Sequence, residues 1–128
     1  MLAFLTALRS KLTGSALASY VGNRIYFEEA PENPTYPYVV YFIVTSSPED
    51  TFTEELDDIM AQFSLFSDSE GATQIATMYG HLTDLMDDAV LTVTGYVFIQ
   101  TTRGIMTPVP GSGVKHWAKD YGYLLQKS

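Results

Sequence analysis

The side chains best suited to catalysis or metal binding are two histidines, His81 and His116. They do not have the spacing that metal sites use, such as two histidines four residues apart on a helix face. A serine nucleophile needs a general base and a sharp strand-to-helix turn, whereas Ser112 stands between two glycines in a proline-containing loop. We therefore interpret His81 as a solvated helix residue and His116 as a polar residue of an interface.

Two acidic clusters, residues 54–58 and 84–88, bring several carboxylates together. Clustered carboxylate oxygens can hold a hard cation, but neither cluster has the D-x-[DN]-x-[DN]-G pattern of a calcium loop. A carboxylate pair for glycoside hydrolysis needs a cleft of defined width, which a sequence does not display. We interpret both clusters as solvated surface.

Cysteine is absent, which excludes disulfides, thiolate zinc sites and a cysteine nucleophile. The glycines match neither the dinucleotide-binding fingerprint nor the phosphate-binding loop. The sequence therefore predicts a protein that is not an enzyme and that has no metal and no cofactor.

The charge balance argues against a nucleic-acid reader. Fifteen acidic and seven basic side chains give a net charge of -8, and such a surface repels phosphate backbones. DNA can still pass nearby without sticking. With 128 residues, 46% of them hydrophobic, the chain predicts a single domain over residues 1–128. It has no apolar run of the roughly 20 residues that a membrane span requires, so we expect no membrane association.

The central element is an apolar run at residues 38–44, rich in aromatic and β-branched side chains. Pro37 and the cluster at residues 46–48 bound it at strand length, so the sequence predicts a strand over residues 38–46 rather than a buried helix. Both of its faces are apolar, and both therefore need cover.

Apolar residues at spacings of three and four predict two amphipathic helices. The first covers residues 2–18, and Gly14 is the point at which it ends or frays toward Tyr20. The second ends near Asp88. Its apolar stripe is formed by Ala72, Ile75, Ala76, Tyr79, Leu82 and Met86.

Alternating patterns predict strands over residues 58–66, 96–102 and 114–126, and two shorter strands over residues 24–27 and 91–93. In the first of these, one face is formed by Ile59, Ala61, Phe63 and Leu65.

Two segments between these strands are predicted to be loops. Residues 47–57 are polar and acidic, without a clear period. Residues 107–113 include two prolines and two glycines, which join a strand ladder poorly.

The predicted fold is α+β, with two helices on one face of a mostly antiparallel sheet, in the order α-β-β-β-α-β-β-β. Two helices cover only part of such a sheet, so large apolar groups are expected where cover is missing, and such patches mark association. The residues expected at this interface are Val39, Tyr41, Ile43, Trp117, Tyr121 and Tyr123.

Several phrases of the chain resemble one protein family. They are an opening amphipathic helix, the phrase VGNRIY at residues 21–26, PYVVY at residues 37–41, the polar segment SPED at residues 47–50, and a closing strand around Trp117 and Asp120. In this combination they resemble the tail completion or tail terminator proteins of long-tailed bacteriophages and prophages. The resemblance covers most of the chain, and its residues are structural rather than catalytic.

The resemblance implies a virion protein of the phage tail that is assembled in the host cytoplasm. Members form a ring, commonly of six subunits, that caps the head-proximal end of the tail tube and halts tube polymerisation. The implied partners are further copies of the chain, the tail tube protein and the head connector. An acidic lumen would let DNA pass without specific binding.

Two hypotheses extend this interpretation. The acidic residues Glu49, Asp50, Glu54 and Glu55 would face the channel or the tube. The loop that contains Pro108 and Pro110 would contact a partner ring.

Alternatives remain open at the level of the sequence. Within a phage, the chain could instead be another neck component or a tail-tube subunit. From a different class, it could be a small ligand-binding or hydrolytic α+β domain that uses Trp117, Tyr121 and Tyr123 as a pocket wall. Native mass and light scattering would separate these classes, because a ring former assembles whereas a pocket protein stays monomeric and shifts its melting temperature with ligand.

Overall fold

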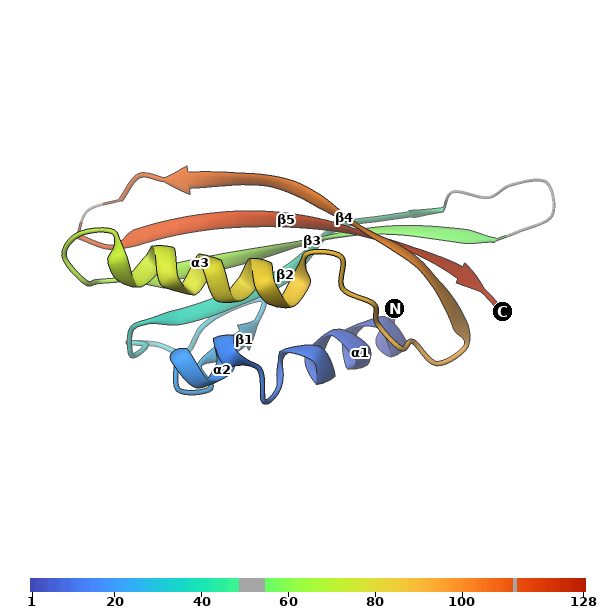
Figure 1. Cartoon of the computed structure of the whole chain (residues 1–128), viewed down its shortest axis with the longest axis horizontal. Coiled ribbons are helices and arrows are strands. Elements are labelled where there is room, and N and C mark those ends of the chain that lie inside the picture. Colours follow the sequence, from blue (N-terminus) through green and yellow to red (C-terminus); the bar gives the residue numbers. More distant parts are fainter. Residues whose placement is uncertain (49–54, 112) are drawn as a thin grey trace.

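In the computed structural model, three helices lie on one face of a five-stranded sheet (Figure 1). The structure describes residues 1–48, 55–111 and 113–128. In chain order the elements are α1 (Leu2–Leu12), α2 (Ala16–Tyr20), β1 (Ile25–Phe27), β2 (Tyr38–Pro48), β3 (Leu56–Ser67), α3 (Thr73–Met86), β4 (Tyr96–Val109) and β5 (Lys115–Lys127).

The strands lie in the order β1-β2-β3-β5-β4. The pair β1 and β2 is parallel, and the other three neighbouring pairs are antiparallel. This confirms the predicted α+β class, with helices on one face of a mostly antiparallel sheet. The predicted order of elements is wrong in two places, since the observed order is α-α-β-β-β-α-β-β.

The first difference is a break in the opening helix. Gly14 has a φ of +75°, a backbone conformation that ends α1 and that glycine adopts without steric cost. Ser15 then caps α2, because its hydroxyl accepts a hydrogen bond from the backbone N–H of Ala18 at 3.1 Å. The sequence indicated this weak point, but the prediction of two helices in total is wrong.

The second difference concerns residues 91–93, which do not form the predicted strand. Their alternation is real, because Leu91 and Val93 are buried whereas Thr92 is exposed. The segment packs its apolar side chains into the core without joining a ladder. The alternating pattern of residues 91–93 therefore predicted correctly which side chains are buried, but its prediction that the segment pairs as a strand is wrong.

The third difference is the length of the strands. Residues 107–109 belong to β4 rather than to a loop, and Pro108 lies opposite Trp117 of β5. A proline is tolerated there because β4 is the edge strand, which needs ladder hydrogen bonds on one side only. Likewise β2 extends to Pro48 and β3 begins at Leu56, so the connection predicted over residues 47–57 is shorter.

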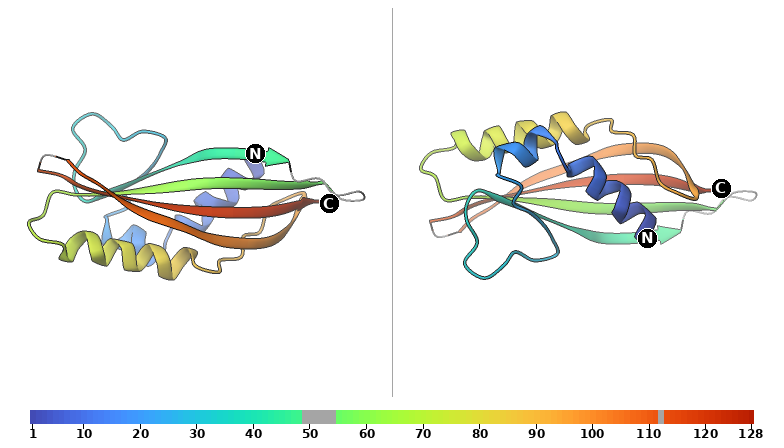
Figure 2. Two further views of the ribbon diagram at one scale, coloured as in Figure 1. Left: turned by 90° about the horizontal axis from the view of Figure 1, so that it is seen from above. Right: turned by 90° about the horizontal axis from the view of Figure 1, so that it is seen from below.

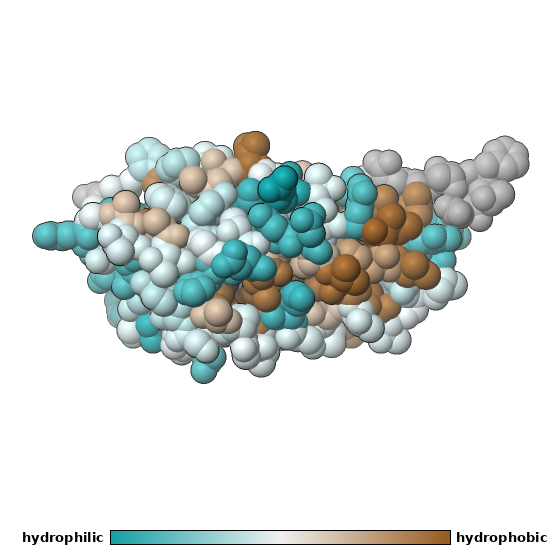
Figure 3. Space-filling model, viewed as in Figure 1, coloured by the Kyte–Doolittle hydropathy of each residue, from teal (hydrophilic) through white to brown (hydrophobic). Residues whose placement is uncertain are grey.

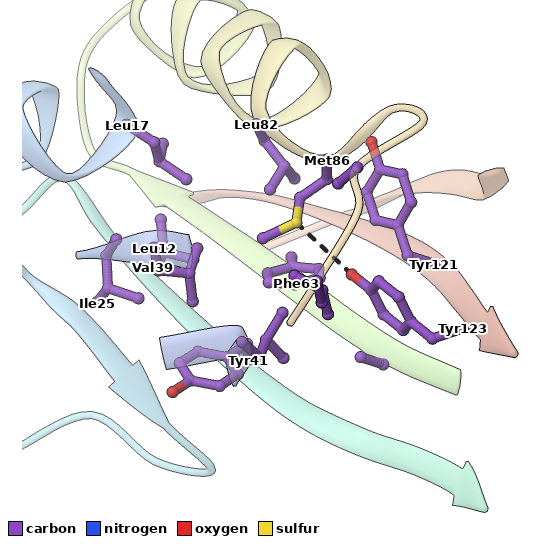
Figure 4. Packing of buried hydrophobic residues seen from close by; sticks show 14 of the residues in the cluster. Leu12, Leu17, Ile25, Val39, Tyr41, Phe63, Leu82, Met86, Tyr121 and Tyr123 are labelled. Atoms are coloured by element: carbon purple, nitrogen blue, oxygen red, sulfur yellow. Dashed lines mark hydrogen bonds between the residues drawn. The ribbon is translucent and has the colours of Figure 1, made fainter. Parts of the chain in front are cut away.

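The core lies between the helices and one sheet face (Figure 4). The face predicted for β3 is confirmed, because Ile59, Ala61, Phe63 and Leu65 are all buried. On α3, the prediction is wrong at Ala72 and Ala76, which are exposed, and it missed Met78. The helical residues buried in this core are Phe4, Leu8, Leu12, Leu17, Ala18, Ile75, Met78, Leu82 and Met86.

Candidate functional site

The candidate catalytic side chains do not come together. His81 lies on α3, with its ring centroid 5.3 Å from that of Tyr20. His116 lies on β5 and stacks on Phe66 at 4.3 Å. Ser112 lies outside the described residues. Within the described part of the chain, no group of three histidine, aspartate or glutamate side chains is placed to hold a metal ion.

The acidic clusters are dispersed along separate elements. Of the four residues predicted to face a channel, Glu49, Asp50 and Glu54 lie outside the described residues. Glu55 is exposed, and its carboxylate lies 3.7 Å from the ammonium group of Lys127. In the second cluster, Asp87 accepts a hydrogen bond of 2.7 Å from the hydroxyl group of Tyr121.

Most of the side chains predicted at an interface belong to the core of this chain. Val39, Tyr41, Tyr121 and Tyr123 are at most 3% exposed beneath the helices. Ile43 and Trp117 are half-buried against the same core. The expectation that these groups lie uncovered is wrong, because three helices rather than two cover this face.

Two tyrosine hydroxyl groups, those of Tyr121 and Tyr123, lie in the core, and burial raises the pKa of each. Burial raises the pKa of Tyr121, and its hydrogen bond to Asp87 raises that pKa further. Burial alone raises the pKa of Tyr123, whose hydroxyl donates to the sulfur of Met86 at 3.6 Å (Figure 4). Trp117 lines a shallow depression with Pro108 and His116, whereas Tyr123 lines a separate one with Asp120 and Leu124.

The opposite face of the sheet has no helix of the described chain over it, as the two views in Figure 2 show. We call it the open face. Strand register and the alternation of side chains assign its positions. Four of its residues on the three inner strands, Tyr38, Val40, Ser64 and Ala118, are buried. The others are Phe42, Thr45, Ser47, Leu56, Asp58, Met60, Gln62, Phe66, His116, Asp120, Gly122, Leu124 and Gln126.

One end of the open face is aromatic. Tyr38 stacks on Phe66 at 4.7 Å, and Phe66 in turn stacks on His116. Tyr36 lies over Tyr38 at 5.1 Å. Burial lowers the pKa of His116, and within the described residues its Nε2 atom has no hydrogen-bond partner. The histidine is therefore neutral at pH 7 and acts as one more member of an aromatic row.

The open face carries no positive charge at its described strand positions. None of these positions is lysine or arginine, since Arg103, Lys115, Lys119 and Lys127 all alternate toward the helix side. Its two carboxylates are Asp58 and Asp120, and Asp120 accepts a hydrogen bond of 2.9 Å from the amide of Gln62. The remaining polar groups at the described positions are hydroxyls, amides and the imidazole of His116, and none of these positions is lysine or arginine.

Apolar side chains are also exposed beside the helices. Leu2 is 78% exposed and Val90 is 72% exposed. They line a groove of about 620 Å³ between α1 and residues 90–94. In Figure 3 hydrophobic residues gather over the segment that follows α3 and over the first part of β4.

Pro108 and Pro110 lie where β4 leads into β5. Pro108 is paired in the ladder, whereas Pro110 follows the end of β4, and both are exposed. Together with Val109, Lys115 and His116 they line a shallow depression of about 280 Å³. The sequence signalled this exposed tip through its prolines and glycines. The apolar pattern of residues 38–44 did not distinguish the open face, because both faces of this strand are apolar.

No helix in the described part of the chain has the length and apolar character needed to cross a membrane.

Comparison with solved structures supports the same fold. A chain from the virion of a native gene transfer agent particle superposes with a TM-score of 0.78 at 16% identity, over 94% of this chain and 92% of that chain. A second solved protein superposes with a TM-score of 0.64 at 12% identity, over 98% of this chain and 95% of that one. No curated protein sequence matches the chain.

A protein-family model settles the family. The model described as tail completion protein gp17 matches residues 6–106, which is most of the chain. The chain therefore belongs to the tail completion protein gp17 family, and it is a structural, non-enzymatic component of a phage virion.

Proposed function

We propose that this protein is a tail terminator: its copies form a ring that caps the head-proximal end of the tail tube, stops tube polymerisation and presents the surface to which the head connector binds. Membership in the tail completion family supports this role. The fold that it shares with a chain of a gene transfer agent virion is consistent with it. The partners would be further copies of the chain, commonly six in a ring, together with the tail tube protein and the head connector.

The observation that carries the proposal is the sheet with one open face and two exposed edges. A closed ring of identical subunits needs two different adhesive patches on each subunit, and its closure depends on the rotation between neighbours. β4 and the β1–β2 side are such unlike patches, since they differ in length and in strand direction. A small ligand-binding domain, the alternative function, would need a pocket and would not need two exposed sheet edges.

The distribution of charge supports a ring through which DNA moves. DNA is held by lysine and arginine side chains that release its counterions, and the open face has neither at any described strand position. Its carboxylates repel phosphates instead. A DNA molecule in contact with this face would slide rather than bind.

The deciding experiment is to image tails that are assembled without this protein. Because a terminator halts tube growth, its loss should give overlong tubes that carry no heads. Tubes of normal length that lack only heads would instead indicate a neck adaptor. Absence of tubes would indicate a tube subunit.

A second experiment tests the acidic residues on the connection between β2 and β3. Replacing Glu49, Asp50, Glu54 and Glu55 with lysine should slow DNA ejection, because the new cations would bind phosphates. The matched control replaces four other acidic residues and changes the net charge equally. These residues are Glu28, Glu29, Glu32 and Glu70, all of which are exposed. Equal ejection rates in the two variants would reject a channel-facing position.

The tip between β4 and β5 is the proposed contact with a partner ring. Replacing residues 110–113 by a two-residue Asn-Gly turn would remove Pro110 but keep Pro108 in its ladder position opposite Trp117. Head-to-tail joining should fail while tail length stays normal. Unchanged joining would reject this contact.

A further inference from the structure

We propose that neighbouring copies in the ring join strand to strand: the outer edge of β4 in one copy pairs with residues 42–48 of β2 in the next copy, so that their sheets become continuous. This inference rests on the ring proposed above. It names the partner of both sheet edges as a second copy of this chain.

The first edge is the part of β2 that β1 does not cover. β1 has three residues, and it pairs only with Val39, Val40 and Tyr41. Beyond Tyr41, β2 continues for seven residues whose only ladder partner within the described chain is β3. Their outward backbone N–H and C=O groups are therefore available to another strand.

The second edge is β4, the outermost strand at the other side of the sheet. It has 14 residues, and Arg103 is its one charged side chain. Its exposed apolar side chains include Ile105 at 70%, Val97 at 52% and Ile99 at 43%. Edge strands that must stay unpaired are usually short or carry charges, prolines or bulges. β4 is long and has one charged side chain, and its proline and register shifts lie outside residues 100–103.

Irregularities restrict the pairing to particular segments of β4. Register shifts lie between Phe98 and Gln100 and between Arg103 and Met106. They leave residues 100–103 as a regular stretch, whereas the other regular stretch, 106–109, contains Pro108, which has no N–H to donate to an added strand. On β2 the shift lies between Ile43 and Thr45, which leaves residues 45–48 regular. Stretches of this length match one another, so a short ladder of about four residues a side is available at each junction.

Strand direction makes this junction antiparallel. β3 runs opposite to β2, β5 runs opposite to β3, and β4 runs opposite to β5. β4 is therefore antiparallel to β2 within one copy. Rotation about a ring axis parallel to the strands keeps each strand's direction, so β4 of one copy meets β2 of the next in antiparallel orientation. The ladder of the sheet then continues with its usual hydrogen-bond pattern.

A hollow marks the place where the added strand would lie. It has a volume of about 530 Å³ and opens where β1 ends and the uncovered part of β2 begins. Its lining residues are the apolar residues Met1, Leu5, Phe27, Phe42 and Ile43 together with Glu28, and the lining includes polar as well as apolar atoms. A strand that continues the line of β1 would cover this hollow with the side chains of its helix-side face. A second copy supplies such a strand in β4.

Cysteine pairing tests the junction, because the chain has no cysteine of its own. One cysteine replaces Thr45 or Ser47 on β2, and the other replaces Gln100 or Thr102 on β4; all four positions are exposed and lie on the open face. Directly opposite residues in an antiparallel pair have Cα atoms about 4.5–5.5 Å apart, within the range of a disulfide. The four double variants are incorporated into virions, which are then oxidised and separated without reducing agent.

At least one double variant should give a ladder of disulfide-linked multimers of this chain, whereas the single-cysteine variants should not. A matched control combines Thr102→Cys with Ala76→Cys, which places the second thiol on the exposed side of α3. This pair should give no ladder. Absence of multimers from all four pairs, or cross-links only to a different virion protein, would overturn the edge-to-edge junction.

Hydrogen exchange gives a second readout that needs no variant. The backbone amides of residues 42–48 and of β4 should exchange at least tenfold more slowly in assembled particles than in the isolated chain. Unchanged exchange at both edges would overturn the junction. Imaging of the tail end separates this outcome from failure of the proposed function: a ring without protected edges refutes only the junction, whereas a single copy at the tail end refutes the ring itself.

Discussion

Gly104 on β4 offers the sharpest test of how the sheet edge is built. A Cβ atom at this position would lie 2.6 Å from the backbone oxygen of Asp120 and 3.0 Å from its backbone carbon. Ordinary van der Waals contact begins near 3.4 Å, so Gly104→Ala forces β4 and β5 apart by roughly 0.8 Å. Both clashing atoms belong to the backbone and cannot rotate away.

The same glycine anchors a buried lysine. Lys119 is 7% exposed, and its ammonium group donates a hydrogen bond of 2.8 Å to the carbonyl oxygen of Gly104. It also lies 5.3 Å from the ring centroid of Tyr121. Moving the carbonyl weakens the hydrogen bond of a charge that has few alternatives in this environment.

The expected cost combines these two effects. Overpacking typically costs about 1–3 kcal/mol, and loss of a hydrogen bond to a charged group costs about 1.5–3 kcal/mol. Since the carbonyl moves without disappearing, we expect Gly104→Ala to lower the free energy of unfolding by about 3 kcal/mol. In a chain of this size that corresponds to a fall in Tm on the order of 10 °C.

Urea unfolding of the purified chain measures this change, and Gly80→Ala is the matched control. Gly80 lies in α3, where a Cβ atom would have no neighbouring atom within 4 Å, and its φ is not positive. The same substitution there should stabilise the chain by about 0.5–1 kcal/mol, because alanine loses less backbone entropy in a helix. A Gly104→Ala variant within about 0.5 kcal/mol of the wild type would refute the reasoning, since that is the spread of neutral surface substitutions.

Three further predictions concern the core. Tyr121→Phe removes the 2.7 Å hydrogen bond to Asp87 and should lower the free energy of unfolding in urea by about 1–2 kcal/mol. This is less than for a fully buried charged pair, because Asp87 is partly exposed. An unchanged urea midpoint would show that the hydrogen bond contributes nothing to stability. Leu82→Ala should lower the free energy of unfolding by about 2–5 kcal/mol, because Leu82 is completely buried. Leu2→Ala, at a residue that is 78% exposed, should change it by no more than about 0.5 kcal/mol. Equal effects of the two substitutions would contradict the placement of the core. Burial raises the pKa of Tyr121 and Tyr123 above the ordinary value of 10.0, so the folded chain retains phenol protons that the unfolded chain releases. The free energy of unfolding should therefore not depend on these groups below pH 10, and it should fall as the pH rises above 10. Tyr123→Phe should make this fall with pH less steep. If Tyr123→Phe leaves the fall unchanged, Tyr123 does not contribute to it.

Much of the fold could be predicted from local patterns. The alternation of residues 58–66 identified the buried face of β3, because one face of that strand is apolar and the other is mixed. The spacing of Leu8 and Leu12 identified the buried side of α1 in the same way. These predictions succeed where an element buries one face and exposes more of the other, because the sequence period then reports on burial. At the start of β2, residues 38–41 are buried on both faces, and the period carries no such information.

The errors occur where burial and pairing separate. Leu91 and Val93 are buried without a ladder, and Pro108 lies in a ladder although proline disfavours one. In both cases the deciding fact is tertiary. The first segment packs against the core instead of alongside a strand, and the second lies on an edge, where a missing N–H has no cost. A local pattern does not contain this information.

The candidate site was misplaced for a related reason. The residues 38–44 are apolar on both sides, so their sequence does not distinguish the face that the helices cover from the open face. Charge does distinguish them, because β4 and β5 together carry Arg103, Lys115, Lys119 and Lys127 at alternating positions of one face only. A face of the sheet that has large apolar and hydroxyl side chains but no cation suits contact with other protein and with moving DNA, whereas a face with partnered lysines suits a covered core. The basic residues of the last two strands therefore mark the face of the sheet that the helices cover. The open face is the other one, which carries Tyr38 and Phe66.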